Sequence, residues 1–374
     1  MKISIDRHEL QRGLARLQSV TEKRNSMPIL ANILMTARDG SADGQLELAG
    51  TDLEVGMRSE HACKVEEGGA LTISGRKLYE IVRELPEEPV ELSSSENSYL
   101  SLRCARSKFT LAGTTAEEYP TFPEFSPERT FTVQTTILAE MIEKTMYAAS
   151  SDEARYNLNG VYLERIEELD KLRIVATDGH RLAYVDRTLG GHADVFDKGV
   201  IIPRKGLAEL KKLLDEEDSD EIELGFEGSS GLARKGGVVL TLRLIEGEFP
   251  NYRNVIPEEG SQRLVLEREG FVHALRRVAL LSSDRSRAVN LKLSAGELAL
   301  SSKNPDLGEA HETLAIDYAG EEFMIAFNAR YLVDAVNALG SKEVCLVFKD
   351  ALSPMRVTPM DDTDTLAVVM PMRI

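Results

Sequence analysis

The chain has 374 residues, of which 42% are hydrophobic and 29% charged, an ordinary composition for a folded soluble protein. Because a single core stops growing beyond ~250–300 residues, this length argues against one continuous domain and indicates two or three. The net charge of −17 argues against a nucleic-acid binder, since attraction to phosphates usually supplies that affinity, but an acidic mean is compatible with a basic inner surface.

The cysteines and the N-terminus give little support to redox, metal or membrane functions. Cys63, Cys104 and Cys345 are odd in number and far apart, which favours reduced, buried thiols over disulfides or a zinc site. No stretch reaches the ~20 apolar residues of a membrane helix, and charges interrupt residues 1–6 where a secretory signal would be apolar. We therefore expect a cytoplasmic protein that needs no cofactor and no metal.

The first third of the chain predicts two helices and an antiparallel sheet. An amphipathic helix is expected over 8–17, where leucines recur at helical spacing. Strand-like alternation then leads to a turn signal at 48–52, and a second helix that opens with a lysine follows at 77–82. Two strand runs, 90–92 and 99–111, close this third and are expected to pair.

The second third repeats these features in the same order. A helix is expected over 137–148, followed by strands that end in a similar turn signal at 175–178. The second helix is expected at 205–210 and again opens with a lysine. Strand runs at 221–226 and 238–244 are expected to pair with each other.

The last third contains a third copy of the pattern. Its first helix is expected over 271–281, the matching turn signal at 300–303, and the second helix at 330–336. Strand runs at 344–348 and 365–370 are expected to pair. One shared motif would be common in any α+β protein, but four features in the same order make chance an unlikely explanation.

Proline-rich connectors separate the three copies. They lie at 119–123 with Pro127, and at 249–252 with Pro257, and they are typical of extended linkers. We therefore predict an α+β chain of three repeated domains, 1–126, 127–256 and 257–374, each with two helices packed on antiparallel sheets.

Repeated domains joined head to tail expose complementary ends, and such contacts close a ring when the rotation per domain divides a circle. Three domains per chain then suggest a dimer of six domains. With helices facing inward, the hole collects helix-borne cations, and the alternative is that these are ordinary solvated helix faces. The cations are Arg12, Arg16, Arg76, Lys77, Lys144, Arg204, Lys205, Lys211, Lys212, Arg276, Arg277 and Arg330.

Five segments carry a resemblance to a known family. They read RNSMPIL at 24–30, TDGHRLA at 177–183, IPRKG at 202–206, FPNYR at 249–253 and VVMPMR at 368–373. Together they resemble the bacterial DNA sliding clamps, the beta subunits of the DNA polymerase III holoenzyme. The resemblance spans the whole chain and agrees with the three repeats.

The resemblance implies a head-to-tail homodimer that forms a six-domain ring around duplex DNA, with helices lining the hole. Retention would come from topology, so weak, sequence-independent phosphate contacts would suffice and a strongly basic hole would hinder sliding. It assigns DNA contact to Arg24, Tyr156, Arg204 and Lys205. The implied partners are the replicative polymerase catalytic subunit, the clamp-loader complex, and translesion and repair polymerases.

The family also captures short partner peptides in an apolar cleft between its second and third domains. An apolar cleft with adaptable methionines suits a motif with Leu and Phe anchors. Asn254 and Pro354 depart from residues common in the family, and either could alter peptide preference at the cleft edge. The matching positions here are Leu158, Thr177, Gly179, His180, Arg181, Leu182, Pro250, Val255, Leu352, Val368, Met370 and Met372.

For ring closure, the resemblance pairs Phe109 and Leu111 with Leu280 and Leu281 of the other protomer. Continuous sheet pairing at this junction would cover exposed strand edges. From pattern alone, Phe109 and Leu111 fit an ordinary core equally well.

Parts of the sequence also fit two other functional classes. Asp178 and His180 are spaced like a catalytic pair, but the chain lacks the common nucleophile, nucleotide-binding and zinc motifs, so we do not expect an enzyme. The alternative to a clamp is a peptide-binding scaffold that does not encircle DNA. Such a scaffold would need the cleft but not Arg24, Arg204 and Lys205.

Overall fold

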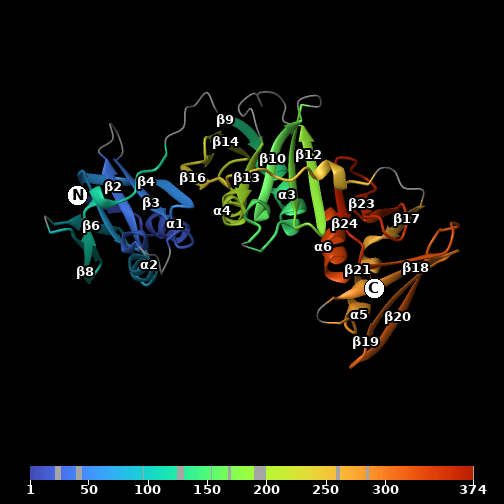
Figure 1. The fold of residues 1–374 in the computed structure, drawn as a ribbon. Coiled ribbons are helices and arrows are strands. Elements are labelled where there is room, and N and C mark those ends of the chain that lie inside the picture. Colours follow the sequence, from blue (N-terminus) through green and yellow to red (C-terminus); the bar gives the residue numbers. More distant parts are fainter. Residues whose placement is uncertain are drawn as a thin grey trace. The chain divides into compact units, whose positions relative to one another are not determined.

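The computed structural model describes residues 1–21, 27–38, 44–95, 97–123, 130–152, 154–166, 170–188, 199–257, 262–283 and 286–373. The chain forms two compact units. Figure 1 labels their helices and strands. The first comprises Met1–Thr136 and Lys205–Leu244, and the second comprises Ile137–Arg204 and Ile245–Ile374. No helix within the described residues is long and apolar enough to cross a membrane.

The first unit contains α1, α2, nearly all of α4, and twelve strands. The helices are α1 (Arg7–Leu17), α2 (Gly75–Arg83) and α4 (Arg204–Leu214), with short 3₁₀ helices at Pro28–Ala31 and Ala116–Glu118. The strands are β1 (Lys2–Ile5), β2 (Asn32–Arg38), β3 (Gly44–Thr51), β4 (Val55–Glu67), β5 (Gly69–Ser74), β6 (Val90–Ser94), β7 (Tyr99–Cys104), β8 (Ser107–Thr114), β9 (Thr130–Gln134), β14 (Glu221–Glu227), β15 (Ser230–Lys235) and β16 (Val238–Arg243).

Helix α1 forms where the leucine spacing predicts it. The Asp6 carboxylate caps the helix by accepting hydrogen bonds from the backbone amides of His8 (2.8 Å) and Glu9 (3.1 Å). Its apolar face, which includes Leu10 and Leu14, is fully buried. The prediction of a helix at 8–17 is therefore confirmed, and the cap places its start one residue earlier.

The twelve strands form one sheet in the order β1-β6-β7-β8-β5-β2-β3-β4-β16-β15-β14-β9. Strand β1 also pairs with β4, so the first eight strands close on themselves. Beyond that closure, β4 pairs antiparallel with β16, from Val55↔Leu242 to Ser59↔Val238. Strands of the first and second predicted domains therefore share one sheet.

A buried lysine terminates α4. The Lys235 ammonium donates hydrogen bonds to the carbonyls of Leu213 (3.0 Å), Leu214 (3.3 Å) and Glu216, and pairs with the Asp218 carboxylate at 3.2 Å. The last carbonyls of a helix have no partner inside the helix, so this side chain, which is 0% exposed, satisfies them.

We expect Lys235→Met to lower the free energy of unfolding by about 3 kcal/mol, because it leaves buried carbonyls without a donor. Lys212→Met is the matched control, since Lys212 is 59% exposed and pairs with Glu209 on the helix surface. Urea unfolding followed by circular dichroism measures both. Equal midpoints for the two variants would contradict the capping role.

Within the described residues, the second unit contains nearly all of α3, together with α5, α6 and twelve strands. The helices are α3 (Thr135–Thr145), α5 (Arg268–Ala279) and α6 (Ala329–Leu339), with 3₁₀ helices at Met146–Ala148, Tyr156–Leu158 and Tyr252–Val255. The strands are β10 (Gly160–Ile166), β11 (Lys171–Thr177), β12 (Arg181–Thr188), β13 (Val200–Pro203), β17 (Gln262–Glu267), β18 (Ala288–Ser294), β19 (Glu297–Asn304), β20 (Gly308–Ala315), β21 (Phe323–Asn328), β22 (Glu343–Phe348), β23 (Met355–Pro359) and β24 (Thr365–Val369).

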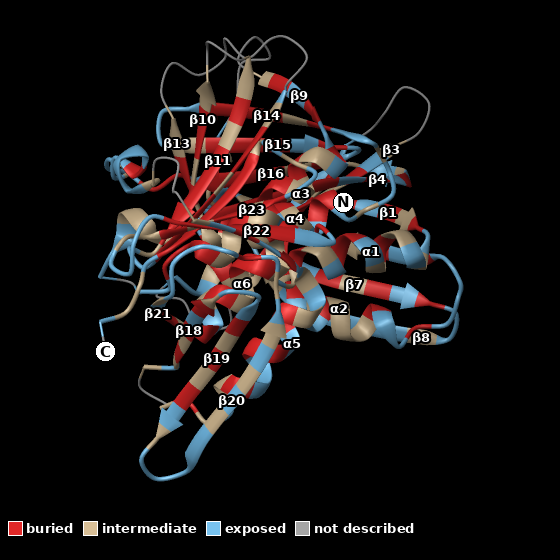
Figure 2. Cartoon of the chain, turned by 90° about the vertical axis from the view of Figure 1, so that its right-hand side faces the viewer, coloured by how far each residue is buried: buried red, intermediate tan, exposed pale blue. Residues whose placement is uncertain are grey.

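These strands form two sheets, β13-β10-β11-β12-β24-β23-β22-β17 and β20-β19-β18-β21. The larger sheet again joins predicted domains, because β12 pairs with β24 from Arg181↔Val369 to Val185↔Thr365. Helices α5 and α6 bury an apolar core between the strands of the last third. In Figure 2 much of the larger sheet is coloured as buried, whereas the residues of β20 are exposed or intermediate.

Two predicted strand pairings are wrong. Strand β15 lies between β14 and β16, so 221–226 does not pair with 238–244, and β23 likewise separates 344–348 from 365–370. Both missed strands are short, and their apolar residues are interrupted by glycine, charge or proline, which hides the period-two pattern.

Three boundaries also differ from the prediction. The run 99–111 is a hairpin of β7 and β8, turned at Ala105 with a φ of 50°. The turn signal expected at 300–303 lies inside β19, because β19 continues to Asn304 and forms a long hairpin with β20. The helix expected to reach 281 ends at Ala279.

Candidate functional site

The turn after β11 is fixed by its own side chains. The Thr177 hydroxyl donates to the Arg181 carbonyl (2.7 Å), and the Asp178 carboxylate accepts from the amides of His180 (2.9 Å) and Arg181 (3.0 Å). Gly179 supplies the left-handed conformation, with φ at 86°, that the turn requires. The turn therefore presents His180 and Arg181 in a fixed orientation at the start of β12.

Arg181 connects this turn to α6. Its guanidinium pairs with Asp334 of α6 at 2.6 Å and with Asp178 at 3.1 Å, and the side chain is only 9% exposed. The group also lies over the rings of Tyr331, at 4.6 Å, and Tyr147, at 5.3 Å. Burial raises the pKa of the Tyr147 phenol, so that ring stays neutral beside the guanidinium.

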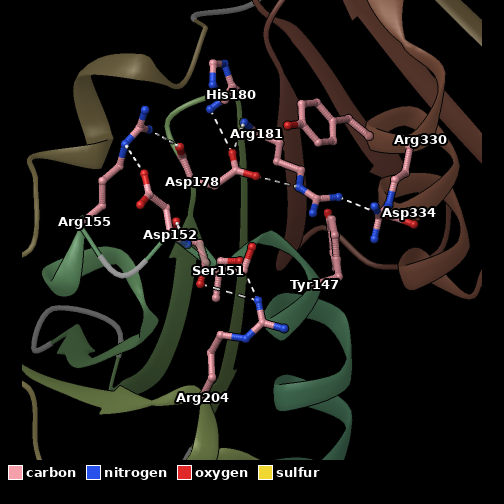
Figure 3. Close-up of a pocket in the computed structure, with 13 residues that line it drawn as sticks. Tyr147, Ser151, Asp152, Arg155, Asp178, His180, Arg181, Arg204, Arg330 and Asp334 are labelled. Carbon is pink, nitrogen blue, oxygen red and sulfur yellow. Dashed lines mark hydrogen bonds and ion pairs between the residues drawn. The ribbon is translucent and has the colours of Figure 1, made fainter. Parts of the chain in front are cut away.

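A cavity of about 620 Å³ opens beside Arg181 (Figure 3). In it, Arg204 donates to the Ala149 carbonyl (2.9 Å) and Arg155 donates to the Asp178 carbonyl (2.8 Å). His180 and Arg181, predicted for peptide binding, therefore share one cavity with Arg204, predicted for DNA contact. The lining residues are Tyr147, Ala149, Ser150, Ser151, Asp152, Arg155, Asp178, His180, Arg181, Arg204, Arg330, Tyr331 and Asp334.

Next to this polar cavity, the chain forms a small apolar cluster of its own. Leu182 pairs with Val368 across β12 and β24, and both side chains are buried with Val175, Tyr252 and Leu366. Partly buried rings, including Tyr162 and Phe249, pack against the cluster; those two stack at 5.0 Å between centroids.

The exposed apolar residues of the predicted cleft belong to the segments that border this cluster. Met370 follows β24 and its amide donates to the His180 carbonyl at 2.9 Å, which fixes it beside the turn. Met370 is 36% exposed, Val255 40% and Leu352 74%. If a partner peptide binds against the buried cluster, these exposed apolar side chains are the ones predicted to contact it.

The remaining predicted cleft residues lie on neighbouring segments. Leu158 is half-buried in the 3₁₀ helix after β9 and α3, and its carbonyl accepts from Ser150 at 2.9 Å. Pro250 is exposed in the connector, and Met372 is half-buried with its amide bonded to the Ala326 carbonyl at 2.7 Å. Asn254 is exposed, and Pro354 is half-buried immediately before β23.

A buried polar network holds the connector against the sheet. Arg173 forms two hydrogen bonds of 2.6 Å with the Asp186 carboxylate and donates to the Tyr252 hydroxyl at 3.1 Å. That hydroxyl donates to Glu164, which also accepts from Arg253 at 2.9 Å. Burial and the bond to Glu164 raise the pKa of Tyr252. The connector is therefore rigidly placed where it borders the apolar cluster.

The other described residues predicted to contact DNA do not line the cavity beside Arg181. Tyr156 is 58% exposed, and Lys205 pairs with Asp52 at 2.6 Å and with Glu54 at 3.3 Å. Arg24 lies outside the described residues.

Many of the helix-borne cations have carboxylate partners on their own unit, which leaves these surfaces only weakly basic. The pairs are Arg12 with Glu9, Arg16 with Glu216, Arg76 and Lys77 with Glu80, Lys144 with Glu140, Lys212 with Glu209, Arg277 with Glu312 and Arg330 with Asp334.

The residues predicted for ring closure are exposed or half-buried. Phe109 is 37% exposed and Leu111 half-buried on β8, so neither belongs to the buried core. Leu280 is 77% exposed after α5, and Leu281 is half-buried. Sequence reasoning missed Leu307, which is 65% exposed and lines a cavity of about 360 Å³ together with Leu280. Only its position in a hairpin turn, where a large apolar residue is unusual, could have indicated it.

Sequence reasoning also missed Tyr147, Arg155, Tyr331 and Asp334, which complete the cavity around Arg181. Tyr147, Tyr331 and Asp334 lie on helical segments and read as ordinary helix residues. Arg155 precedes a 3₁₀ helix and carries no sequence signal.

Comparison with known proteins gives matches over the whole chain. Models of the DNA polymerase III beta subunit match in order: the N-terminal domain at 1–123, the central domain at 132–251 and the C-terminal domain at 253–373. The beta sliding clamps of Caulobacter vibrioides and Escherichia coli are 36% and 34% identical to the chain, with all of each protein covered. The crystal structure of the DNA polymerase III subunit beta from Pseudomonas aeruginosa is 34% identical and superposes with a TM-score of 0.93 over all of both chains. A sliding clamp from Bartonella birtlesii bound to griselimycin is 36% identical, also with a TM-score of 0.93 over all of both chains. The domain boundaries at 126 and 256 stay a prediction.

Proposed function

Because this chain belongs to the DNA polymerase III beta-subunit family, we propose that it is a processivity factor whose homodimeric ring encircles duplex DNA and tethers polymerases through a peptide cleft. The observation that carries the peptide-binding part is the buried cluster around Leu182 and Val368, next to which the exposed Met370 is fixed by the bond of its amide to the His180 carbonyl. A partner peptide with Leu and Phe anchors would cover these side chains.

The proposed cleft consists of the twelve residues predicted from the sequence, from Leu158 to Met372. Its polar edge is the turn from Thr177 to Arg181, whose hydrogen bonds hold the His180 side chain at the rim. The ring of His180 stacks near Tyr331, at 6.1 Å between centroids. Preorganised polar groups beside an apolar floor are the usual composition of a specific binding site.

The proposed DNA contacts are Arg24, Tyr156, Arg204 and Lys205. The pairing of Lys205 with Asp52 and Glu54 supports weak contact, because a cation already neutralised within the chain releases few counterions from DNA. Weak contact is what a sliding protein requires. The proposed partners are the replicative polymerase, the clamp loader, and translesion and repair polymerases, and the proposed location is the cytoplasm.

The proposed ring closes through Phe109 and Leu111 of one protomer and Leu280 and Leu281 of its partner. Strand β8 pairs with β5 only at Gly113 and Thr114, and β20 lies at the end of its sheet, so both present edges that another sheet could cover. We propose no catalytic role for Asp178 and His180, since the Asp178 carboxylate already bonds the backbone amides of its own turn and the Arg181 guanidinium.

Replacing Met370 with aspartate should weaken peptide binding about 10- to 100-fold, because an apolar contact worth ~1.5–3 kcal/mol is lost and a charge must be desolvated. Fluorescence polarisation with a short synthetic peptide carrying Leu and Phe measures the affinity. Met360→Asp is the control, since Met360 is 50% exposed but lies outside the proposed cleft. Unchanged affinity in Met370→Asp would refute the cleft.

A further inference from the structure

The hydrogen bonds of the Thr177 turn recur in the first unit. The Thr51 hydroxyl donates to the Val55 carbonyl (3.0 Å), and the Asp52 carboxylate accepts from the amides of Glu54 (2.9 Å) and Val55 (2.8 Å). Leu53 stands where the other turn has Gly179, and it adopts the same left-handed conformation, with φ at 77°. The two turns are therefore structural copies.

The segments around each turn are copies as well. Val55↔Leu242 and Gly56↔Thr241 pair β4 with β16, as Arg181↔Val369 and Leu182↔Val368 pair β12 with β24. The connectors that follow read EYPTF at 118–122 and EFPNY at 248–252, with glutamate, aromatic, proline and aromatic residues at matching positions. The first unit thus contains copies of three parts of the proposed peptide cleft, namely the turn, the strand pair and the connector.

These elements of the first unit line a cavity of about 170 Å³. A cavity of ~150 Å³ lined by apolar side chains accommodates a benzene ring, so this one has room for a single aromatic or aliphatic side chain. It is smaller than a typical ligand site. The lining residues are Thr51, Leu53, Glu54, Gly56, Pro120, Thr121, Phe122, Pro123, Ser229, Ser230, Thr241, Leu242 and Arg243.

The smaller size has a local cause. Gly56 occupies the position in this copy that Leu182 occupies in the other. A Cβ at Gly56 would lie 2.8 Å from the Phe122 ring. The absence of that side chain lets Phe122 lie across the strand, where it occupies part of the space and receives Arg58 over its ring at 5.5 Å. What remains is a pocket for one anchor residue.

The rim of the pocket carries an exposed apolar side chain, Leu53, and an exposed cation, Arg243. Leu53 is 48% exposed there, although a large apolar residue with positive φ is rare at the surface. Among the residues that the structure describes, no carboxylate pairs with the exposed Arg243 side chain, whereas Glu54 is paired with Lys205. The pocket is therefore complementary to an apolar side chain that has a carboxylate next to it.

We propose that this pocket is a second peptide-anchor site, which receives one aromatic or aliphatic side chain of an acidic partner peptide while Arg243 binds the adjacent carboxylate. This proposal rests on the proposed function, since it assigns the same class of ligand to the copy of the cleft. Because only one anchor fits, binding is at least about 10-fold weaker than at the cleft.

Methyl-labelled full-length protein titrated with a synthetic acidic peptide carrying Leu and Phe tests the proposal by NMR. Val55 and Leu242 report on the pocket, and Leu182 and Val368 report on the cleft. Both pairs should shift, the first at higher peptide concentration. The double variant Leu53→Asn, Arg243→Glu should abolish the first response and leave the second, because asparagine tolerates positive φ and the pocket residues are remote in sequence from the cleft.

Shifts confined to Leu182 and Val368 would overturn the second site and leave the proposed function standing. The same holds if the Val55 and Leu242 shifts persist in the double variant. A peptide that shifts neither pair would overturn the cleft itself.

Discussion

Replacing Arg181 with alanine is expected to lower the free energy of unfolding of its unit by about 3 kcal/mol, and to weaken peptide binding with it. Removal of one partner from a buried ion pair leaves an uncompensated charge, which typically costs ~3–5 kcal/mol. Asp334 is 30% exposed and Asp178 14%, so water relieves part of that cost and the lower end is expected. The loss extends to binding because Arg181 connects the His180 turn to α6.

Arg330→Ala is the matched control for this experiment. Arg330 approaches the same Asp334 carboxylate at 3.8 Å but is 64% exposed, so its removal should change stability very little. Urea unfolding followed by circular dichroism compares the two variants. Adding Asp334→Ala to Arg181→Ala should recover part of the lost stability, since it removes one of the unpaired charges. Equal stabilities of Arg181→Ala and Arg330→Ala would contradict the importance of this contact.

Leu280→Asp should convert the dimer into a folded monomer. Leu280 is 77% exposed in the chain and borders the cavity of about 360 Å³ that Leu307 also lines, so its substitution leaves the core intact. In the proposed ring, each protomer junction would lose ~1.5–3 kcal/mol of apolar burial and would gain a desolvated carboxylate. Two junctions close the ring, so the effect occurs twice.

Leu352→Asp provides the control for Leu280→Asp, because Leu352 is almost equally exposed, at 74%, but borders the proposed cleft. Light scattering coupled to size exclusion should give the single-chain mass for Leu280→Asp and twice that mass for Leu352→Asp. A dimer in both variants would place the protomer contact elsewhere on the surface.

Local periodicity predicted most of the regular structure. The leucine spacing of 8–17 and the apolar pattern of 137–148 predict helices that the fold contains, because burial of one helix face depends on residues close in sequence. Strands β15 and β23 were missed because their stability comes from central positions in sheets rather than from their own composition.

The candidate site was only partly accessible from the sequence. The side chains of Thr177 and Asp178 form hydrogen bonds with nearby backbone and so determine its turn. A local sequence pattern can predict a turn of this kind. The partner of Arg181 is Asp334, more than a hundred positions away, and no spacing rule connects them. The first-unit copy is harder still, because Leu53 occupies a conformation for which glycine is the expected residue.

Lys235 illustrates the same limit. A lysine on a strand ordinarily predicts an exposed position, yet here the end of α4 and the turn after it supply three carbonyls that make its burial favourable. That environment exists only after the sheet and helix have packed.

The measurement closest to the central claim is retention on nicked circular DNA, onto which a clamp loader has placed the protein, before and after the circle is cut. Topological linkage predicts that the protein stays on the closed circle at raised salt, where phosphate contacts weaken, and leaves after linearisation. Retention that is unaffected by cutting, or release from the intact circle at the same salt, would contradict a ring and favour a peptide-binding scaffold.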